Sequence, residues 1–164
     1  MRGGLGGTLP DKQLRALDFL IGDSSGPGFV YPPDGSPHPF VGHLHVERES
    51  CERFLRMEFF GQISMLGWES VHSLISYSEK TGNYRMWSFS SSQEEPLSFQ
   101  GKFEGSSLVL ISDPTEMVWG LQRVRCIFTP LCESMVEYRL DFWTIDGYTP
   151  YFQGTYTNAS VHAL

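Results

Sequence analysis

Residues 68–91 read WESVHSLISYSEKTGNYRMWSFSS, and this stretch decides the fold class. Its two halves are rich in aromatic and aliphatic residues, and they are separated by the polar segment 79–83, which contains Gly82 and Asn83. Two apolar runs joined by a short turn of this composition are typical of a β-hairpin. We therefore predict antiparallel strands over residues 68–78 and 83–91.

Strand chemistry continues on both sides of this hairpin, in runs of 6–12 residues that end at turn residues. Glu104-Gly105-Ser106 and Asp146-Gly147 are two further turn signals. Since no connection is long enough for a crossover helix, neighbouring strands should be antiparallel. We predict the other strands over 29–31, 40–49, 51–60, 96–103, 107–112, 116–120, 121–129, 133–144 and 149–157.

About ten sequential antiparallel strands leave no free edge if they close into a barrel. The sequence therefore predicts an all-β fold: a single up-and-down antiparallel β-barrel with one short N-terminal helix. A barrel of this size can hold a small ligand. A β-sandwich is the alternative architecture.

The short N-terminal helix is predicted over residues 10–21. Thr8 followed by Asp11 is similar to a capping box, and Gly22 is a natural stop. Apolar residues recur at helical spacing between them, namely Leu14, Leu17, Leu20 and Ile21. This stripe should be buried against the barrel. We divide the chain into a flexible tail (1–9), a barrel domain (10–158) and a C-terminal tail (159–164).

The composition limits the class of partner. The chain of 164 residues has 12 basic and 19 acidic residues, a net charge of −7, and 14% aromatic residues. This acidity argues against nucleic acid or an anionic membrane as the partner, and no apolar stretch approaches the roughly 20 residues of a membrane helix. Cys51, Cys126 and Cys132 have no metal-like spacing. We expect three reduced thiols in a cytoplasmic protein. A homodimer is an open alternative to a monomer.

His43-Leu44-His45-Val46-Glu47 is the sharpest local pattern. On a strand, residues 43, 45 and 47 point the same way, and two imidazoles with a carboxylate can hold a transition metal. With Glu49, the spacing matches the first motif of the cupins. The second cupin motif needs a distant histidine, and His162 alone follows His72. We therefore predict no metal and a solvent-facing histidine strand.

Residues 16–32, ALDFLIGDSSGPGFVYP, resemble the opening of the nitrobindin-like and related calycin barrels. The matching residues, in order, are Leu20, Gly22, Gly26, Gly28, Tyr31 and Pro32. Residues 67–89, with Tyr77 and Tyr84 around the turn, are similar to a barrel family of uncharacterised function. Residues 137–158, EYRLDFWTIDGYTPYFQGTYTN, are similar to the closing hairpin of both groups. The resemblance implies a calycin-like barrel.

Two departures from the nitrobindin pattern bear on haem. Ser24 stands where that pattern has tryptophan, and Pro150-Tyr151-Phe152 stands where it has the haem-ligating histidine. Tyrosine can bind ferric haem. We nevertheless expect no cofactor, and a haem-binding nitrobindin-like protein is one alternative function.

Several charged or polar side chains lie within otherwise apolar strands. Arg85 alternates with Trp87 and Phe89, and Asp141 shares a face with Trp143. Such a mixture is typical of an apolar pocket with a few orienting groups, although one face of a barrel strand is also solvated. The predicted ligand-binding residues are Trp68, Arg85, Trp87, Phe89, Arg125, Tyr138 and Trp143.

The predicted function is binding of a small, largely hydrophobic ligand inside the barrel. An enzyme is the second alternative, a cyclase or isomerase of a hydrophobic metabolite that uses an acid/base pair in the cavity. The candidate catalytic residues, chosen for their chemistry, are Glu69, His72, Asp141 and Tyr151.

Overall fold

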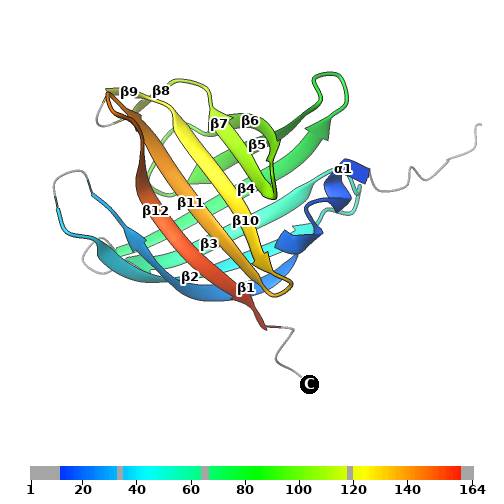
Figure 1. Cartoon of the computed structure of the whole chain (residues 1–164), viewed down its shortest axis with the longest axis horizontal. Coiled ribbons are helices and arrows are strands. Elements are labelled where there is room, and N and C mark those ends of the chain that lie inside the picture. The colour runs from blue at the N-terminus through cyan, green and yellow to red at the C-terminus, as the bar shows by residue number, and fades with distance from the viewer. Residues whose placement is uncertain (1–11, 33–34, 64–66, 118–119, 160–164) are drawn as a thin grey trace, which may run out of the picture.

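The computed structural model describes residues 12–32, 35–63, 67–117 and 120–159. Within these ranges, ten antiparallel strands form a closed barrel (Figure 1). The predicted tail at 1–9 and residues 160–164 of the predicted C-terminal tail lie outside the described residues. The predicted all-β barrel is confirmed, and the sandwich alternative is wrong.

The barrel strands follow one another around the wall in chain order, with β1 beside β12 at the closing seam. Their bounds are β1 (Gly22–Val30), β2 (His38–Arg48), β3 (Leu55–Ile63), β4 (Gly67–Ser78), β5 (Asn83–Ser90), β6 (Leu97–Glu104), β7 (Ser107–Ser112), β10 (Val124–Cys132), β11 (Met135–Thr144) and β12 (Gly147–Asn158). A small separate sheet pairs β8 (Thr115–Met117) with β9 (Gly120–Gln122).

The helix predicted over 10–21 is interrupted in the structure, and residues 10 and 11 lie outside the described part. It consists of α1 (Lys12–Arg15) and a 3-10 turn, η1 (Asp18–Leu20). Together they lie across one end of the barrel (Figure 1), and Leu14, Leu17 and Leu20 are almost fully buried. The Tyr84 hydroxyl ties α1 to the barrel by donating a hydrogen bond to the carbonyl of Gln13 at 2.7 Å. The predicted burial is thus confirmed for the three leucines, while Ile21 is half-buried. Neither short segment in the described part has the length or hydrophobicity to cross a membrane.

Strand β1 is much longer than predicted. It covers Gly22–Val30, whereas a strand was predicted only over 29–31. Its sequence, GDSSGPGFV, has poor strand propensity. At Gly26, a Cβ atom would lie only 1.9 Å from the carbonyl oxygen of Thr155 on β12. Glycine is needed here because the backbones of the two strands approach too closely for any side chain.

Other strand boundaries differ as well. The predicted strand over 116–120 overlaps the end of β8 and the start of β9, and residues 118–119 lie outside the described residues. The predicted strand over 51–60 begins only at Leu55, because residues 51–54 form a turn in which Glu52 has a positive φ of 55°. The predicted strand over 121–129 is divided, since Gln122 ends β9 and Val124 begins β10.

Aromatic rings from several strands pack against one another inside the barrel. Phe59 on β3 contacts Tyr138 on β11 and Phe152 on β12, with ring centroids 6.1 and 5.3 Å apart. Phe40 stacks on Phe152 at 4.8 Å, and Phe128 stacks on Tyr138 at 4.8 Å. The Phe59 contacts join β3 to β11 and β12 through the interior, whereas the two stacked pairs join adjacent or nearby strands.

Candidate functional site

The inner face of the barrel follows from strand register and burial. Buried residues alternate with exposed ones along β2, β5 and β11, and paired residues share a face. Two charged side chains belong to the inner face in the described strands. Arg48 lies at the helix end and pairs with Asp18 of η1. Glu69 lies near the opposite end, on β4, on the same face as the buried Ser73 and Ile75.

Glu69 is held by serine hydroxyls from the neighbouring strand. The hydroxyl of Ser90 donates a hydrogen bond to Glu69 Oε1, and the hydroxyl of Ser92 donates another at 3.0 Å. Glu69 and Ser90 are half-buried. These two bonds fix the carboxylate at the end of the barrel that α1 leaves uncovered.

Two tyrosines lie within electrostatic reach of Glu69. Burial is the main cause that raises the pKa of Tyr151, and the negative charge of Glu69 raises it further. Burial also raises the pKa of Tyr138, with a smaller contribution from Glu69. The Tyr151 ring packs against Phe142, with centroids 4.5 Å apart. Glu69, Tyr138 and Tyr151, all predicted site residues, therefore face the same interior.

Tyr156 brings a buried polar atom into the middle of the barrel. Its side chain is fully buried, and its hydroxyl has no hydrogen-bond partner among the described residues. The hydroxyl lies over Gly154 and Gly42, where a Cβ atom on either residue would come within 2.4 and 3.0 Å of it, respectively. The two glycines therefore leave the space that the phenol occupies.

We expect Tyr156→Phe to keep or raise the free energy of unfolding, by up to about 1 kcal/mol, because the change removes an unpaired buried hydroxyl. Urea unfolding of the two proteins measures the difference. Tyr138→Phe is the comparison variant. The Tyr138 hydroxyl lies in hydrogen-bond contact with Cys126, so its removal should lower the free energy of unfolding. A loss of more than about 1 kcal/mol in Tyr156→Phe would mean that the hydroxyl has a partner.

The predicted inward orientation of Arg85, Trp87 and Phe89 is wrong. Tyr84 and Met86 on β5 are buried on the inner face. Arg85, Trp87 and Phe89 therefore lie on the outer face, and Phe89 is 52% exposed. Arg85 does not point into the interior, because the inner face of β5 is formed by Tyr84, Met86, Ser88 and Ser90.

His72 and Trp68 also face outward from β4. His72 is exposed and lies 3.5 Å from Glu58 on the outer face. Trp68 is 59% exposed and stacks on Phe60, with ring centroids 4.6 Å apart. Their predicted place in the cavity is wrong, since their neighbours on the strand, Glu69 and Val71, hold the inner positions.

Asp141, Arg125 and Trp143 lie on the outer wall. Asp141 is fully buried there, because the guanidinium groups of Arg125 and Arg139 cover it at 2.6 Å each. Trp143 is 52% exposed. The prediction of Asp141 as a cavity acid or base is therefore wrong in its placement.

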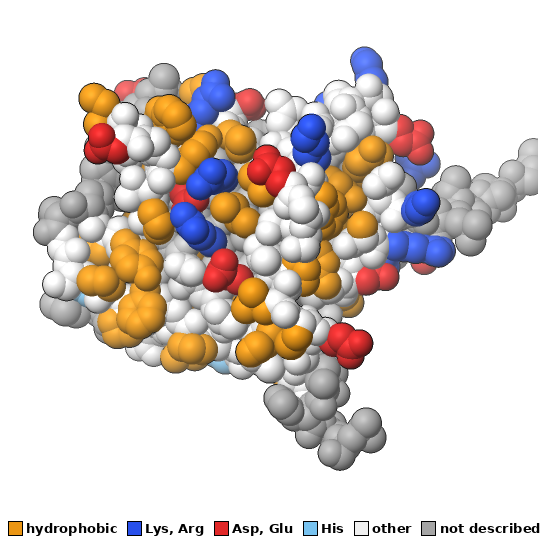
Figure 2. Space-filling model, viewed as in Figure 1, with side chains coloured by type: hydrophobic (Ala, Val, Ile, Leu, Met, Phe, Trp, Pro, Cys, Tyr) orange, Lys and Arg blue, Asp and Glu red, His pale blue; other side chains and the backbone are white. Residues whose placement is uncertain are grey.

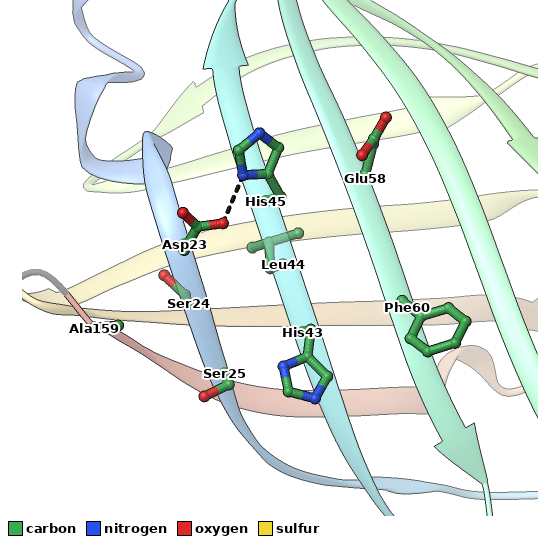
Figure 3. Close-up of a pocket in the computed structure, with 9 residues that line it drawn as sticks. All are labelled: Asp23, Ser24, Ser25, His43, Leu44, His45, Glu58, Phe60 and Ala159. Carbon is green, nitrogen blue, oxygen red and sulfur yellow. Dashed lines mark hydrogen bonds and ion pairs between the residues drawn. The ribbon is translucent and has the colours of Figure 1, made fainter.

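The histidine strand faces solvent, as predicted (Figure 3). His45 Nδ1 lies 2.6 Å from Asp23 Oδ1, and Glu47 pairs with Arg56. A shallow groove of about 280 Å³ runs past His43, His45 and Phe60. Among the described residues, no three His, Cys, Asp or Glu side chains converge on a position for a metal ion.

The Asp23 hydrogen bond is the main cause that raises the pKa of His45, and Glu47 adds to it while burial opposes it. Protonated His45 therefore stabilises the folded state below the unfolded pKa, and this contribution is lost as the pH rises through the folded pKa. We expect Asp23→Asn to lower the pKa of His45 in an NMR titration of the ring. Glu94→Gln, an exposed control, should leave it unchanged, and an unchanged pKa in Asp23→Asn would refute the pairing.

Sequence reasoning missed Ser90, Ser92 and Tyr156. The hairpin register carried a usable signal: Tyr77 pairs with Tyr84 and Val71 with Ser90. Extending that register past the end of β5 brings Ser92 opposite Glu69. No signal distinguishes Tyr156 from the other tyrosines, because its position depends on glycines at two other places in the wall.

No protein-family model matches the chain, and no curated protein sequence matches it. Solved structures do match. Rv2717c from M. tuberculosis superimposes with a TM-score of 0.63 at 14% sequence identity, covering 90% of this chain and 97% of that one. The S-type phycobiliprotein lyase CPES from Guillardia theta superimposes with a TM-score of 0.61 at 7% identity, covering 93% and 94%.

These structural neighbours share the overall fold of the chain, which is a closed antiparallel β-barrel. Identities this low establish the shared fold and carry no activity with them. The barrel fold that the resemblance implied is thus confirmed.

Proposed function

We propose that the barrel binds a small, largely apolar molecule at the end opposite α1, and that Glu69 accepts a hydrogen bond from an N–H, O–H or ammonium group of that molecule. The observation that carries the proposal is the position of Glu69 on the inner face, half-buried and fixed by Ser90 and Ser92. A carboxylate in an apolar interior needs donors, and a ligand can add one.

The surroundings of Glu69 support an apolar ligand. Tyr151 and Phe142 are half-buried, and Phe59 and Tyr138 are buried behind them. Mostly aromatic walls with a few placed polar groups are typical of small-molecule sites. The net charge of −7 supports a small molecule over nucleic acid or an anionic membrane. A homodimer stays a prediction, which sedimentation velocity tests.

We expect Glu69→Gln to weaken binding of 1-aminoanthracene about ten-fold, because a hydrogen bond to a charged group is replaced by a neutral one. Binding of 1-methylanthracene, which has no donor, should not change. Fluorescence titration measures both. Glu58→Gln on the outer face of β3 is the matched control and should bind both probes normally. Equal loss of both probes, or no loss of either, would refute the role of Glu69.

The residues at this position favour an apolar ligand over the haem alternative. Tyr151 stands where the resemblance has a haem ligand, and ferric haem binds tyrosine as tyrosinate. Burial and the charge of Glu69 both raise the pKa of Tyr151 and so oppose that form.

An enzyme remains the second candidate, because Glu69 and Tyr151 provide a base and a hydroxyl at the same end of the barrel. One neighbour of this fold is a lyase by name. If the pair is catalytic, a metabolite extract incubated with the protein should yield a product by mass spectrometry. That product should disappear in Glu69→Gln and persist in Glu58→Gln.

A further inference from the structure

A second site lies on the outer wall, separate from the barrel interior. A groove of about 480 Å³ runs between the β8–β9 sheet and the β11–β12 hairpin. The described residues that line it are Pro114, Gln122, Arg123, Trp143 and Tyr148. The volume is that of a small-molecule site. Figure 2 shows basic and acidic side chains among hydrophobic ones on the face formed by β10, β11 and β12.

The aromatic wall of this groove is held in place by a chain of contacts. Asp141, fully buried, accepts two hydrogen bonds from Arg125, at 2.6 and 3.0 Å. The Arg125 guanidinium lies 4.2 Å from the centre of the Tyr148 ring. Tyr148 in turn meets Trp143 edge-on, with centroids 4.9 Å apart. The indole of Trp143 is thereby positioned while staying 52% exposed.

The charge of the groove is opposite to that of the protein. Arg123 lines the groove, is exposed and forms no ion pair with any described residue. Arg125 and Arg139 share the single carboxylate of Asp141 behind it. Arg123 is the charged side chain among the described residues that line the groove, and its positive charge favours an anion.

Gln122, one of the residues that line the groove, carries an unused acceptor. The side-chain oxygen Oε1 of Gln122 is buried and has no hydrogen-bond partner among the described residues. A buried acceptor without a donor is costly, and a ligand O–H or N–H would relieve that cost.

From this geometry we infer that the groove binds a flat aromatic organic anion that carries a hydrogen-bond donor. The ring stacks on Trp143, the anionic group pairs with Arg123, and the donor reaches Gln122. The inference does not depend on the proposed interior site, because the two sites share no residue.

The test uses 6-hydroxynaphthalene-2-sulfonate as the probe and 2-naphthol as its neutral counterpart. The chain has four tryptophans, and the indole N–H signal of Trp143 in a ¹H–¹⁵N spectrum is assigned by its absence in Trp143→Leu. We expect the sulfonate to shift this signal and to bind about five-fold more tightly than naphthol, the equivalent of about 1 kcal/mol for a surface ion pair. Higher salt should reduce that preference.

Arg123→Gln should remove the preference for the sulfonate, whereas Arg85→Gln on β5 should keep it as the matched control. Glu69→Gln should leave the titration unchanged, so failure of this site is distinguishable from failure of the interior one. The inference is overturned if naphthol binds as well as the sulfonate, if Arg123→Gln has no effect, or if the probe shifts another tryptophan and leaves Trp143 unmoved.

Discussion

Leu17→Asp should lower the free energy of unfolding by about 4 kcal/mol, because it places an unpaired carboxylate in an apolar site and removes a buried leucine. Leu17 is 0% exposed between α1 and η1, in the core cluster with Leu14 and Leu20. Urea unfolding followed by tryptophan fluorescence measures the loss.

Ala16→Asp introduces the same carboxylate one residue earlier, at an exposed position, and should change the free energy of unfolding by less than about 0.5 kcal/mol. Because Leu17→Asp can prevent folding altogether, Leu17→Ala is the second variant, with an expected loss of about 3 kcal/mol. Wild-type stability in Leu17→Ala would show that the N-terminal segment does not pack on the barrel in solution.

Asp141→Ala is the second change with a large expected effect, a loss of about 2–3 kcal/mol. It removes the shared acceptor of Arg125 and Arg139, whose side chains are 28% and 30% exposed. This partial exposure lets water solvate the two guanidinium groups, so the loss falls below the roughly 3–5 kcal/mol that is typical when a buried charge is left unpaired.

Asp146→Ala, at an exposed position in the β11–β12 turn, is the control and should behave like the wild type in thermal and urea unfolding. If Asp141→Ala unfolds like the wild type, the arginine cluster does not stabilise the barrel. Loss of probe binding in the outer groove without loss of stability would instead assign Asp141 to that groove.

The fold was predictable where turn chemistry and strand composition agree. The hairpin of β4 and β5 follows from residues 79–83, and its observed bounds, Gly67–Ser78 and Asn83–Ser90, differ little from the predicted ones. Strand β1 was not predictable in the same way. Its glycines are required because the backbone of β12 lies very close, and composition does not reveal that contact.

The candidate site was predictable in part, for a different reason. Glu69 stands out because a carboxylate is rare within an apolar strand. The facing of β5 could not be derived, since both of its faces carry large apolar side chains: Tyr84 and Met86 inside, Trp87 and Phe89 outside. When both faces of a strand are apolar, the alternation of side chains does not show which face points into the barrel.

The seam between β1 and β12 has a consequence for how the protein is made. β1 is hydrogen-bonded to a strand that is synthesised last among the ten, with Ser24 opposite Asn158 and Val30 opposite Phe152. During translation, the edges of β1 and of the newest strand stay unpaired until β12 leaves the ribosome. Open edges of this kind invite pairing with other nascent chains. Codon choice in the last strands, and the chaperones available while they are synthesised, should therefore affect the soluble yield strongly. The same factors should matter less during synthesis of β4 and β5, whose pairing is local.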